Sequence, residues 1–231
     1  MQNFKQLKGD ASDRKFYRKK YKEGNSIVIL AKKNKSKNLL VYDAISKILD
    51  KNKILAPKLY QQNYKNNYIE VEDFGNETIF KILKKNKKFS YFKDIIKLLN
   101  QLQLIKDKKI KNFQNKYYNI PEYKKEILIQ EANLFCDWYV KKNLTKNNRQ
   151  NFNKKFKKVI KTLSSHLKMK NKVFVHRDFH VSNLMFVHGR IGVIDSQDAL
   201  IGNRAYDLAS LVDDVRLKTS KTLKDKIFNF Y

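Results

Sequence analysis

Three polar residues between positions 176 and 198 have the types and spacing needed for phosphoryl-transfer chemistry. Asp178 and Asn183 are five positions apart in what reads as a tight loop, and Asp195 follows the strand-like residues 191–194. A carboxylate in such a loop can accept the proton of an attacking hydroxyl. Mg²⁺ prefers one or two carboxylates together with phosphate oxygens and water. The spacing therefore predicts Asp178 as a general base, and Asn183 and Asp195 as magnesium ligands beside nucleotide phosphates.

The charge distribution also singles out this segment. Residues 171–216 contain five Lys or Arg and six Asp, although the whole chain has a formal charge of +29. Acids that accumulate in an otherwise basic chain favour a divalent-cation site. The excess of Lys elsewhere is compatible with nucleic-acid binding. We favour a compositional explanation, because Lys runs occur together with abundant Asn, Ile, Tyr and Phe, as AT-rich codons produce. A basic nucleic-acid-binding protein or a non-catalytic scaffold remains the alternative from a different class.

The overall composition predicts a folded globular protein. The chain has 231 residues, of which 42% are hydrophobic and 13% aromatic, and a disordered polycation would lack these aromatics. A single cysteine, Cys136, excludes an intramolecular disulfide. The N-terminus lacks the apolar stretch of a signal peptide, and no apolar run approaches the ~20 residues of a membrane span. We therefore expect a cytoplasmic protein without a membrane span.

Hydrophobic patterning predicts a small β-rich N-terminal lobe followed by a mainly helical lobe. In the first lobe we expect short strands within residues 4–31, including 26–31, a helix at 38–52 and a strand at 68–71. In the second we expect helices at 78–86, 90–105, 121–143 and 147–168, strands at 173–175, 184–187 and 191–194, and a helix at 204–216. The predicted fold class is α+β with two lobes. Residues 1–75 would bind the nucleotide, and residues 76–231 would carry the catalytic loop, the metal site and the acceptor side of one phosphotransferase domain.

Three motifs resemble those of a known superfamily. The chain reads His-Arg-Asp-Phe-His-x-x-Asn-Leu-Met, then Val-Ile-Asp-x-Gln-Asp-Ala, then Gly-x-x-x-Tyr-Asp-Leu-Ala-Ser-Leu. This order resembles the aminoglycoside phosphotransferase/choline kinase superfamily. Segments 9–14, 71–75 and 131–139 resemble its branch of bacterial anomeric kinases of N-acetylmuramate and N-acetylglucosamine in cell-wall recycling. The resemblance implies a protein-kinase-like fold, ATP and Mg²⁺ as cofactors, and a small-molecule acceptor, most simply an amino sugar; choline and aminoglycosides remain alternative acceptors.

The resemblance also implies roles for individual residues. Asp178 corresponds to the catalytic base, and Asn183 and Asp195 correspond to the magnesium ligands. Met185 would line the floor of the adenine pocket, and residues 70–73 would meet the adenine edge.

Contacts to the phosphates are implied at two further places. The loop that contains Gly9, Ala11 and Ser12 would cover the phosphates with its backbone. A lysine after the strand at 26–31 would contact the α- and β-phosphates, and both Lys32 and Lys33 qualify.

The chain departs from the family pattern in four respects. It has no G-x-G-x-x-G motif, and the helix at 38–52 offers only Asp43 as a partner for the lysine. Ser196 occupies a position where this branch usually has an aromatic residue, and the family continues with further helices beyond the apolar end at Tyr231. We therefore expect a fragment or a reduced version of such a kinase.

Two competing interpretations of the motifs are disfavoured. A protein kinase needs an activation segment, and only ten residues separate Asp195 from Ala205. An H-x-D-x-H zinc site would leave Asn183 without a role. Within the kinase interpretation, we expect His176 to be structural and Asp207 to brace the catalytic loop.

Overall fold

A five-stranded antiparallel sheet forms the N-terminal part of the chain. The structure is a computed structural model that describes residues 4–7, 14–86, 88–167 and 172–231. The sheet order is β1-β2-β3-β5-β4. Its strands are β1 (Phe4–Leu7), β2 (Lys15–Tyr21), β3 (Gly24–Leu30), β4 (Leu59–Asn63) and β5 (Tyr68–Glu72). The predicted strands at 26–31 and 68–71 correspond to β3 and β5, which pair with each other in the middle of the sheet.

Helix α1 (Lys37–Lys51) links this sheet to the rest of the molecule. Leu39 and Tyr42, near its start, pack with Ile29, Ile69 and Val71 of the sheet. Further along the helix, buried apolar residues at positions 45, 48 and 49 join the larger core of the C-terminal part. The helical spacing of these residues therefore places one face of α1 in two hydrophobic clusters.

The C-terminal part is mainly helical. Its helices are α2 (Ile79–Lys85), α3 (Phe89–Gln103), α4 (Lys125–Leu134), α5 (Lys141–Asn143), α6 (Lys146–His166), α7 (Ala205–Val212) and α8 (Lys221–Phe230). A π-helical segment, Phe135–Val140, connects α4 to α5. The large core packs α2 and α3 against the segment that carries the predicted catalytic residues.

Three small antiparallel pairs complete the C-terminal part. Their strands are β6 (Lys109–Lys111) with β7 (Tyr117–Asn119), β8 (Lys172–Val175) with β11 (Leu200–Asn203), and β9 (Leu184–Val187) with β10 (Arg190–Val193). The β8–β11 and β9–β10 pairs flank residues 176–183 and 194–199. Both catalytic segments are therefore held at their ends by strand pairing.

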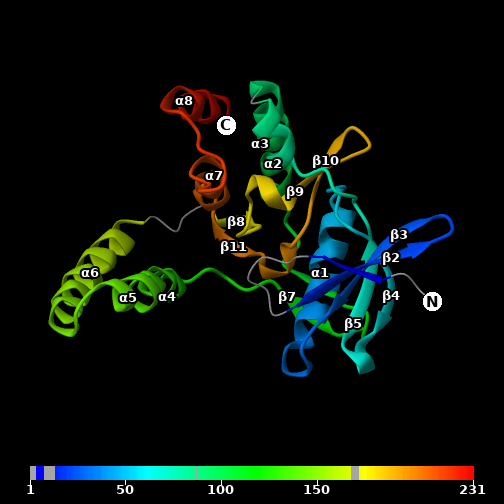
Figure 1. The fold of residues 1–231 in the computed structure, drawn as a ribbon, viewed down its shortest axis with the longest axis horizontal. Coiled ribbons are helices and arrows are strands. Elements are labelled where there is room, and N and C mark those ends of the chain that lie inside the picture. The colour runs from blue at the N-terminus through cyan, green and yellow to red at the C-terminus, as the bar shows by residue number, and fades with distance from the viewer. Residues whose placement is uncertain (1–3, 8–13, 87, 168–171) are drawn as a thin grey trace.

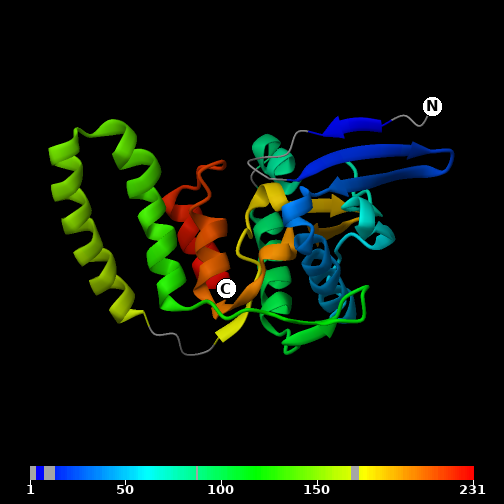
Figure 2. The same ribbon diagram turned by 90° about the horizontal axis from the view of Figure 1, so that it is seen from below.

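The elements are arranged along one long direction. Figures 1 and 2 place the N-terminal sheet at one end of the molecule and the helical hairpin of α4, α5 and α6 at the other, with α3, α7 and α8 between them. Helix α8 packs against α3. Across the described part of the chain, no helix combines the length and the apolar character that crossing a membrane requires.

The predicted α+β class, with a β-rich N-terminal region and a helical C-terminal region, is confirmed. Several boundaries were wrong. The helix predicted at 121–143 begins only at Lys125, because residues 121–123 pair with the segment around Ile201 through backbone hydrogen bonds. The helix predicted at 204–216 ends at Val212. The strands β4, β6, β7 and β11 and the helix α8 were not predicted.

Gly192 allows β10 to lie close to the chain segments that join the sheet to the helical part. A Cβ atom at this position would lie 2.8 Å from Phe74 Cε2 and 3.1 Å from both Cγ and the carbonyl oxygen of Leu55. The Leu55 carbonyl is fixed, because it accepts a hydrogen bond of 2.8 Å from the Val193 N–H. We expect Gly192→Ala to lower the free energy of unfolding by about 1–3 kcal/mol through overpacking, as measured by urea denaturation.

The matched control for this substitution is Arg190→Ala, on the same strand but exposed to solvent. It should change the free energy of unfolding by no more than about 0.5 kcal/mol. A Gly192→Ala protein as stable as the wild type would contradict the close approach.

Candidate active site

A cleft of about 520 Å³ lies between the N-terminal sheet and the catalytic segment. Residues of β2, β3 and β5 form one wall. The other wall includes four of the residues predicted from the sequence, namely Asp178, Asn183, Met185 and Asp195. The volume lies within the range of ~300–1,000 Å³ typical of small-molecule sites. The fold therefore gathers the predicted base, both predicted metal ligands and the predicted adenine contact around one cavity.

The catalytic loop begins where β8 ends. A 3-10 turn, Val181–Asn183, returns the chain to β9. Within this loop the Asn183 side-chain amide donates a hydrogen bond of 3.1 Å to the Asp178 carbonyl. The Ile194 N–H donates one of 3.0 Å to the Asn183 carbonyl. These bonds hold Asn183 between Asp178 and the end of β10, which is where Asp195 follows.

Asp207 braces the start of this loop from α7. Its carboxylate accepts the His176 N–H at 2.7 Å and the Arg177 N–H at 2.9 Å. The bracing fixes a left-handed backbone at Arg177, where φ is 77°. Asp207 is 1% exposed, and burial raises its pKa from 3.8 to about 7. The predicted role of Asp207 as a scaffold acid is confirmed.

His176 lies inside the protein and away from the cleft. It is fully buried, and burial lowers its pKa from 6.5 to about 4. The imidazole is therefore neutral near pH 7. His176 donates to Asp207 through its backbone N–H and not through its ring. This position agrees with the structural role expected for His176.

The environment of Asp178 suits a proton acceptor. Burial raises the pKa of its carboxyl above 3.8, and the negative charge of Asp195 raises it further. A carboxylate with a raised pKa is a stronger base than an ordinary surface aspartate.

Arg14 supplies a cation next to the predicted metal ligand. Its guanidinium lies 2.8 Å from Asp195 Oδ1, and only 11% of the Arg14 side chain is exposed. Arg14 immediately precedes β2, and its neighbours at positions 8–13 are outside the described residues. The predicted phosphate-covering positions Gly9, Ala11 and Ser12 belong to that segment.

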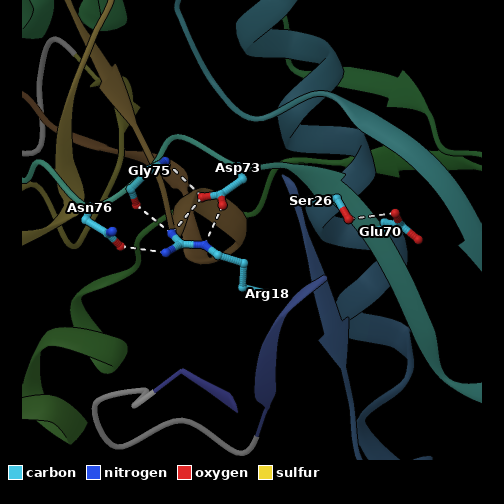
Figure 3. Close-up of polar contacts among 6 residues, drawn as sticks. All are labelled: Arg18, Ser26, Glu70, Asp73, Gly75 and Asn76. Carbon is cyan, nitrogen blue, oxygen red and sulfur yellow. Dashed lines mark hydrogen bonds and ion pairs between the residues drawn. The ribbon is translucent and has the colours of Figure 1, made fainter. Parts of the chain in front are cut away.

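A second arginine of β2 fastens the sheet to the connector that follows β5. Arg18 Nε lies 2.5 Å from Asp73 Oδ2, and Arg18 Nη2 donates at 2.9 Å to Asp73 Oδ1 and to the Gly75 carbonyl. Its Nη1 donates at 2.7 Å to Asn76 Oδ1. Figure 3 shows this fork, with Gly75 turning the chain around it. The connector is therefore held against the mouth of the cleft, which Arg18, Asp73 and Gly75 all line.

The sheet holds a second polar group that was not predicted. Ser26 donates a hydrogen bond of 2.6 Å to Glu70 (Figure 3). Glu70 also pairs with Lys19 at 3.2 Å. Despite burial, these hydrogen bonds keep the pKa of Glu70 below its ordinary value. Glu70 therefore acts within the sheet, next to the segment 70–73 expected at the adenine edge.

The structure does not bring the predicted lysines to the cleft. Lys32 and Lys33 are exposed at the start of a 3-10 turn, and neither is among the residues that line the cleft in the described part of the chain. Asp43, the expected partner, pairs with Lys47 at 2.8 Å instead. Arginines provide the positive charge at the cleft wall.

The signal that could have revealed these arginines is their rarity. Of 51 Lys and Arg residues in the chain, seven are arginine. Three of the seven, Arg14, Arg18 and Arg216, line the cleft. Arginine forms planar two-point contacts that lysine cannot reproduce. The rarity of arginine could therefore have marked Arg14, Arg18 and Arg216 as candidates for specific contacts.

The comparison with known families agrees with this site. The phosphotransferase enzyme family, APH, matches residues 3–231. The chain belongs to the phosphotransferase enzyme family. Among solved structures, choline kinase LicA from Streptococcus pneumoniae superposes with a TM-score of 0.69 at 14% identity, covering 99% of this chain and 74% of that one. The ADP-bound aminoglycoside phosphotransferase APH(2'')-Ib gives a TM-score of 0.67 at 19% identity, covering 99% and 77%. The predicted protein-kinase-like fold of this family is confirmed.

Curated relatives within the family carry a more specific name. An N-acetylmuramate/N-acetylglucosamine kinase of Neisseria meningitidis serogroup B is 29% identical over 205 residues, which are 89% of this chain and 59% of that protein. The protein of the same name from Pseudomonas aeruginosa is 25% identical over 206 residues, 89% and 58% of the two chains. The chain thus spans less than two thirds of the length of these relatives.

Proposed function

We propose that this family member transfers the γ-phosphoryl group of ATP to a hydroxyl of an amino sugar such as N-acetylmuramate or N-acetylglucosamine. The observation that carries the proposal is the convergence of Asp178, Asn183 and Asp195 on one wall of a nucleotide-sized cleft. The names of the curated relatives support the amino sugar as acceptor. Cell-wall sugar recycling in the cytoplasm, where ATP is available, is the setting that fits this activity.

In the chemical step Asp178 acts as the proton acceptor. Its carboxylate accepts the proton of the acceptor hydroxyl while the hydroxyl oxygen forms a bond to the γ-phosphorus. The bond between that phosphorus and the bridging oxygen breaks, and ADP leaves with the electron pair. Asp207 keeps the loop backbone in place during this step through its bonds to His176 and Arg177. Positioning and electrostatic stabilisation account for most catalysis of this kind.

The residues at the end of β10 fit a magnesium ion. Asp195 offers carboxylate oxygens, and the oxygen of the Asn183 side chain is the atom of that residue that would bind the metal, because its nitrogen donates to the Asp178 carbonyl. Oxygen ligands of this type suit Mg²⁺. In the present structure Asp195 Oδ1 is paired with the Arg14 guanidinium at 2.8 Å. When bound, Mg²⁺ would neutralise charge on the phosphates.

The nucleotide would occupy the side of the cleft formed by the sheet and the connector. Met185, which is 5% exposed, would pack against the adenine. Residues 1–75 would serve as the nucleotide lobe and residues 76–231 as the lobe of the base, the metal ligands and the acceptor. In this proposal Arg14 takes over the phosphate contact that was first expected of Lys32 or Lys33.

The proposal is tested by measuring ADP production by the full chain with Mg·ATP and four acceptors: N-acetylmuramate, N-acetylglucosamine, choline and an aminoglycoside. We expect turnover with at least one amino sugar and its loss when EDTA removes the metal. If the chain preferred choline or the aminoglycoside, the amino sugar would be wrong as the proposed acceptor. Binding of Mg·ATP without turnover for any acceptor would refute the proposed activity for this chain. Failure to bind Mg·ATP, with salt-sensitive binding of nucleic acid instead, would favour the alternative class.

A further inference from the structure

The three arginines of the cleft differ in how strongly the protein already engages them. Arg14 has an ion pair of 2.8 Å with Asp195 and a side chain that is 11% exposed. Arg18 has one of 2.5 Å with Asp73 and is 13% exposed. Arg216 has only a 3.3 Å pair with Asp214, and 42% of its side chain is exposed. Arg216 is therefore the cleft arginine best able to bind an incoming ligand.

The backbone of Arg216 is nevertheless fixed. The turn after α7 places Asp214 inside the protein, where its side chain is 0% exposed. Asp214 Oδ1 accepts the backbone N–H of Arg216 at 2.9 Å, and the following residue, Leu217, is buried in the large core. The backbone of Arg216 is thus fixed while its guanidinium remains open to solvent. Such pre-organisation is typical of a recognition residue.

The position of Arg216 assigns it to the acceptor side of the cleft. It lines the cleft together with Asp178 and His180 of the catalytic loop. His180 lies two residues after Asp178 in the catalytic loop. Arg14, by contrast, lies at Asp195, on the side of the metal and the phosphates. Arg216 therefore lines the same cavity as the base, to which the acceptor hydroxyl must come.

The charges of the cleft explain why a cation is needed there. Asp178, Asp195 and Asp198 line the same cavity. An acceptor with a carboxylate of its own would be repelled by them unless a cation compensated its charge. The planar fork of arginine matches a carboxylate in two-point contact.

We propose that Arg216 binds a carboxylate carried by the acceptor sugar whose hydroxyl meets Asp178. The inference rests on the proposed function and deepens it, because it names the substrate group that is recognised. The two sugars in the names of the relatives form a matched pair for this question. N-acetylmuramate bears a lactyl ether with a carboxylate, and N-acetylglucosamine lacks it.

The test measures binding, so that it does not depend on turnover. Both sugars are titrated into the full chain in the presence of Mg·ADP by isothermal titration calorimetry, for the wild type and for Arg216→Gln. We expect Arg216→Gln to weaken binding of N-acetylmuramate about tenfold or more and to change binding of N-acetylglucosamine by less than about twofold. Arg216→Lys keeps the charge and loses the planar fork. Its affinity for N-acetylmuramate should lie between those of the wild type and Arg216→Gln, and its affinity for N-acetylglucosamine should stay close to that of the wild type.

Arg190→Gln is the matched control, because it removes an exposed arginine outside the cleft and should leave both affinities unchanged. Thermal melting of each variant checks folding, and Arg216→Lys keeps the test decisive if the glutamine variant does not fold. Equal weakening for both sugars, or no binding of N-acetylmuramate by the wild type, would overturn the inference. If N-acetylmuramate binds in an Arg216-dependent way but no turnover is measured, the inference about Arg216 is supported and the proposed function is refuted.

Discussion

Asp178→Asn is expected to lower the turnover number with the preferred acceptor by about 10²–10⁴-fold. The amide cannot accept the proton of the attacking hydroxyl, and no other carboxylate holds the same place in the catalytic loop. The geometry of the cleft should persist, because the loop is held through the Asp178 carbonyl and not through its side chain. Binding of Mg·ATP is therefore expected to remain close to that of the wild type. The measurements are steady-state kinetics and nucleotide titration.

The pH profile of the wild type provides a second readout for the base. Because burial and Asp195 raise the pKa of Asp178 above 3.8, the protonated, inactive form should appear at a higher pH than for an exposed aspartate. The rate should thus decline on the acidic side. Asp213→Asn, an exposed carboxylate beyond α7, is the matched control and should turn over normally. A turnover number for Asp178→Asn within about tenfold of the wild type would exclude Asp178 as the base.

Asp207→Ala is expected to lower the free energy of unfolding by about 2–5 kcal/mol. The substitution leaves the His176 and Arg177 N–H groups without their acceptors, and buried donors without partners are costly. It should also lower turnover, because the left-handed backbone at Arg177, next to the base, loses its support. Urea denaturation and steady-state kinetics measure the two effects.

Asp213→Ala is the control for this second substitution. Asp213 directly follows α7, is 68% exposed and pairs only with Lys224 among its described ion pairs, so its loss should cost no more than about 1 kcal/mol. The difference between wild type and Asp207→Ala should also depend on pH. The pKa of Asp207 is raised to about 7, so its stabilising contribution is complete below pH 3.8 and declines as pH rises through 7. If the difference in free energy of unfolding between the wild type and Asp207→Ala grew with pH, it would contradict the raised pKa of the buried Asp207 carboxyl.

The catalytic segment was predictable because its chemistry is local in the sequence. Asp178, Asn183 and Asp195 lie within 18 positions, and strand-like residues surround them. The bracing role of Asp207 was also predicted, within the kinase interpretation, from its place in the Tyr-Asp-Leu-Ala motif at the start of a helix. The arginines were missed for the opposite reason. Arg14 and Arg216 come from segments more than 150 residues apart that only the folded chain brings to one cleft.

The missed strands have a similar explanation. β4 is largely exposed and polar, so it lacks the alternation that marks a half-buried strand. β11 contains Gly202 and pairs with β8, more than 20 residues earlier in the sequence. The π-helical segment 135–140 follows a period that differs from the regular helical one. Local patterns carry little information about pairings set by distant parts of the chain.

The position of α1 in two hydrophobic clusters makes the two parts of the molecule mutually dependent for their stability. Unfolding the sheet alone would strip Leu39 and Tyr42 of their partners and loosen the same helix whose Ile45 and Ile48 complete the larger core. Unfolding of either part therefore removes packing contacts from the other, and α1 couples the stability of the sheet to that of the helical part.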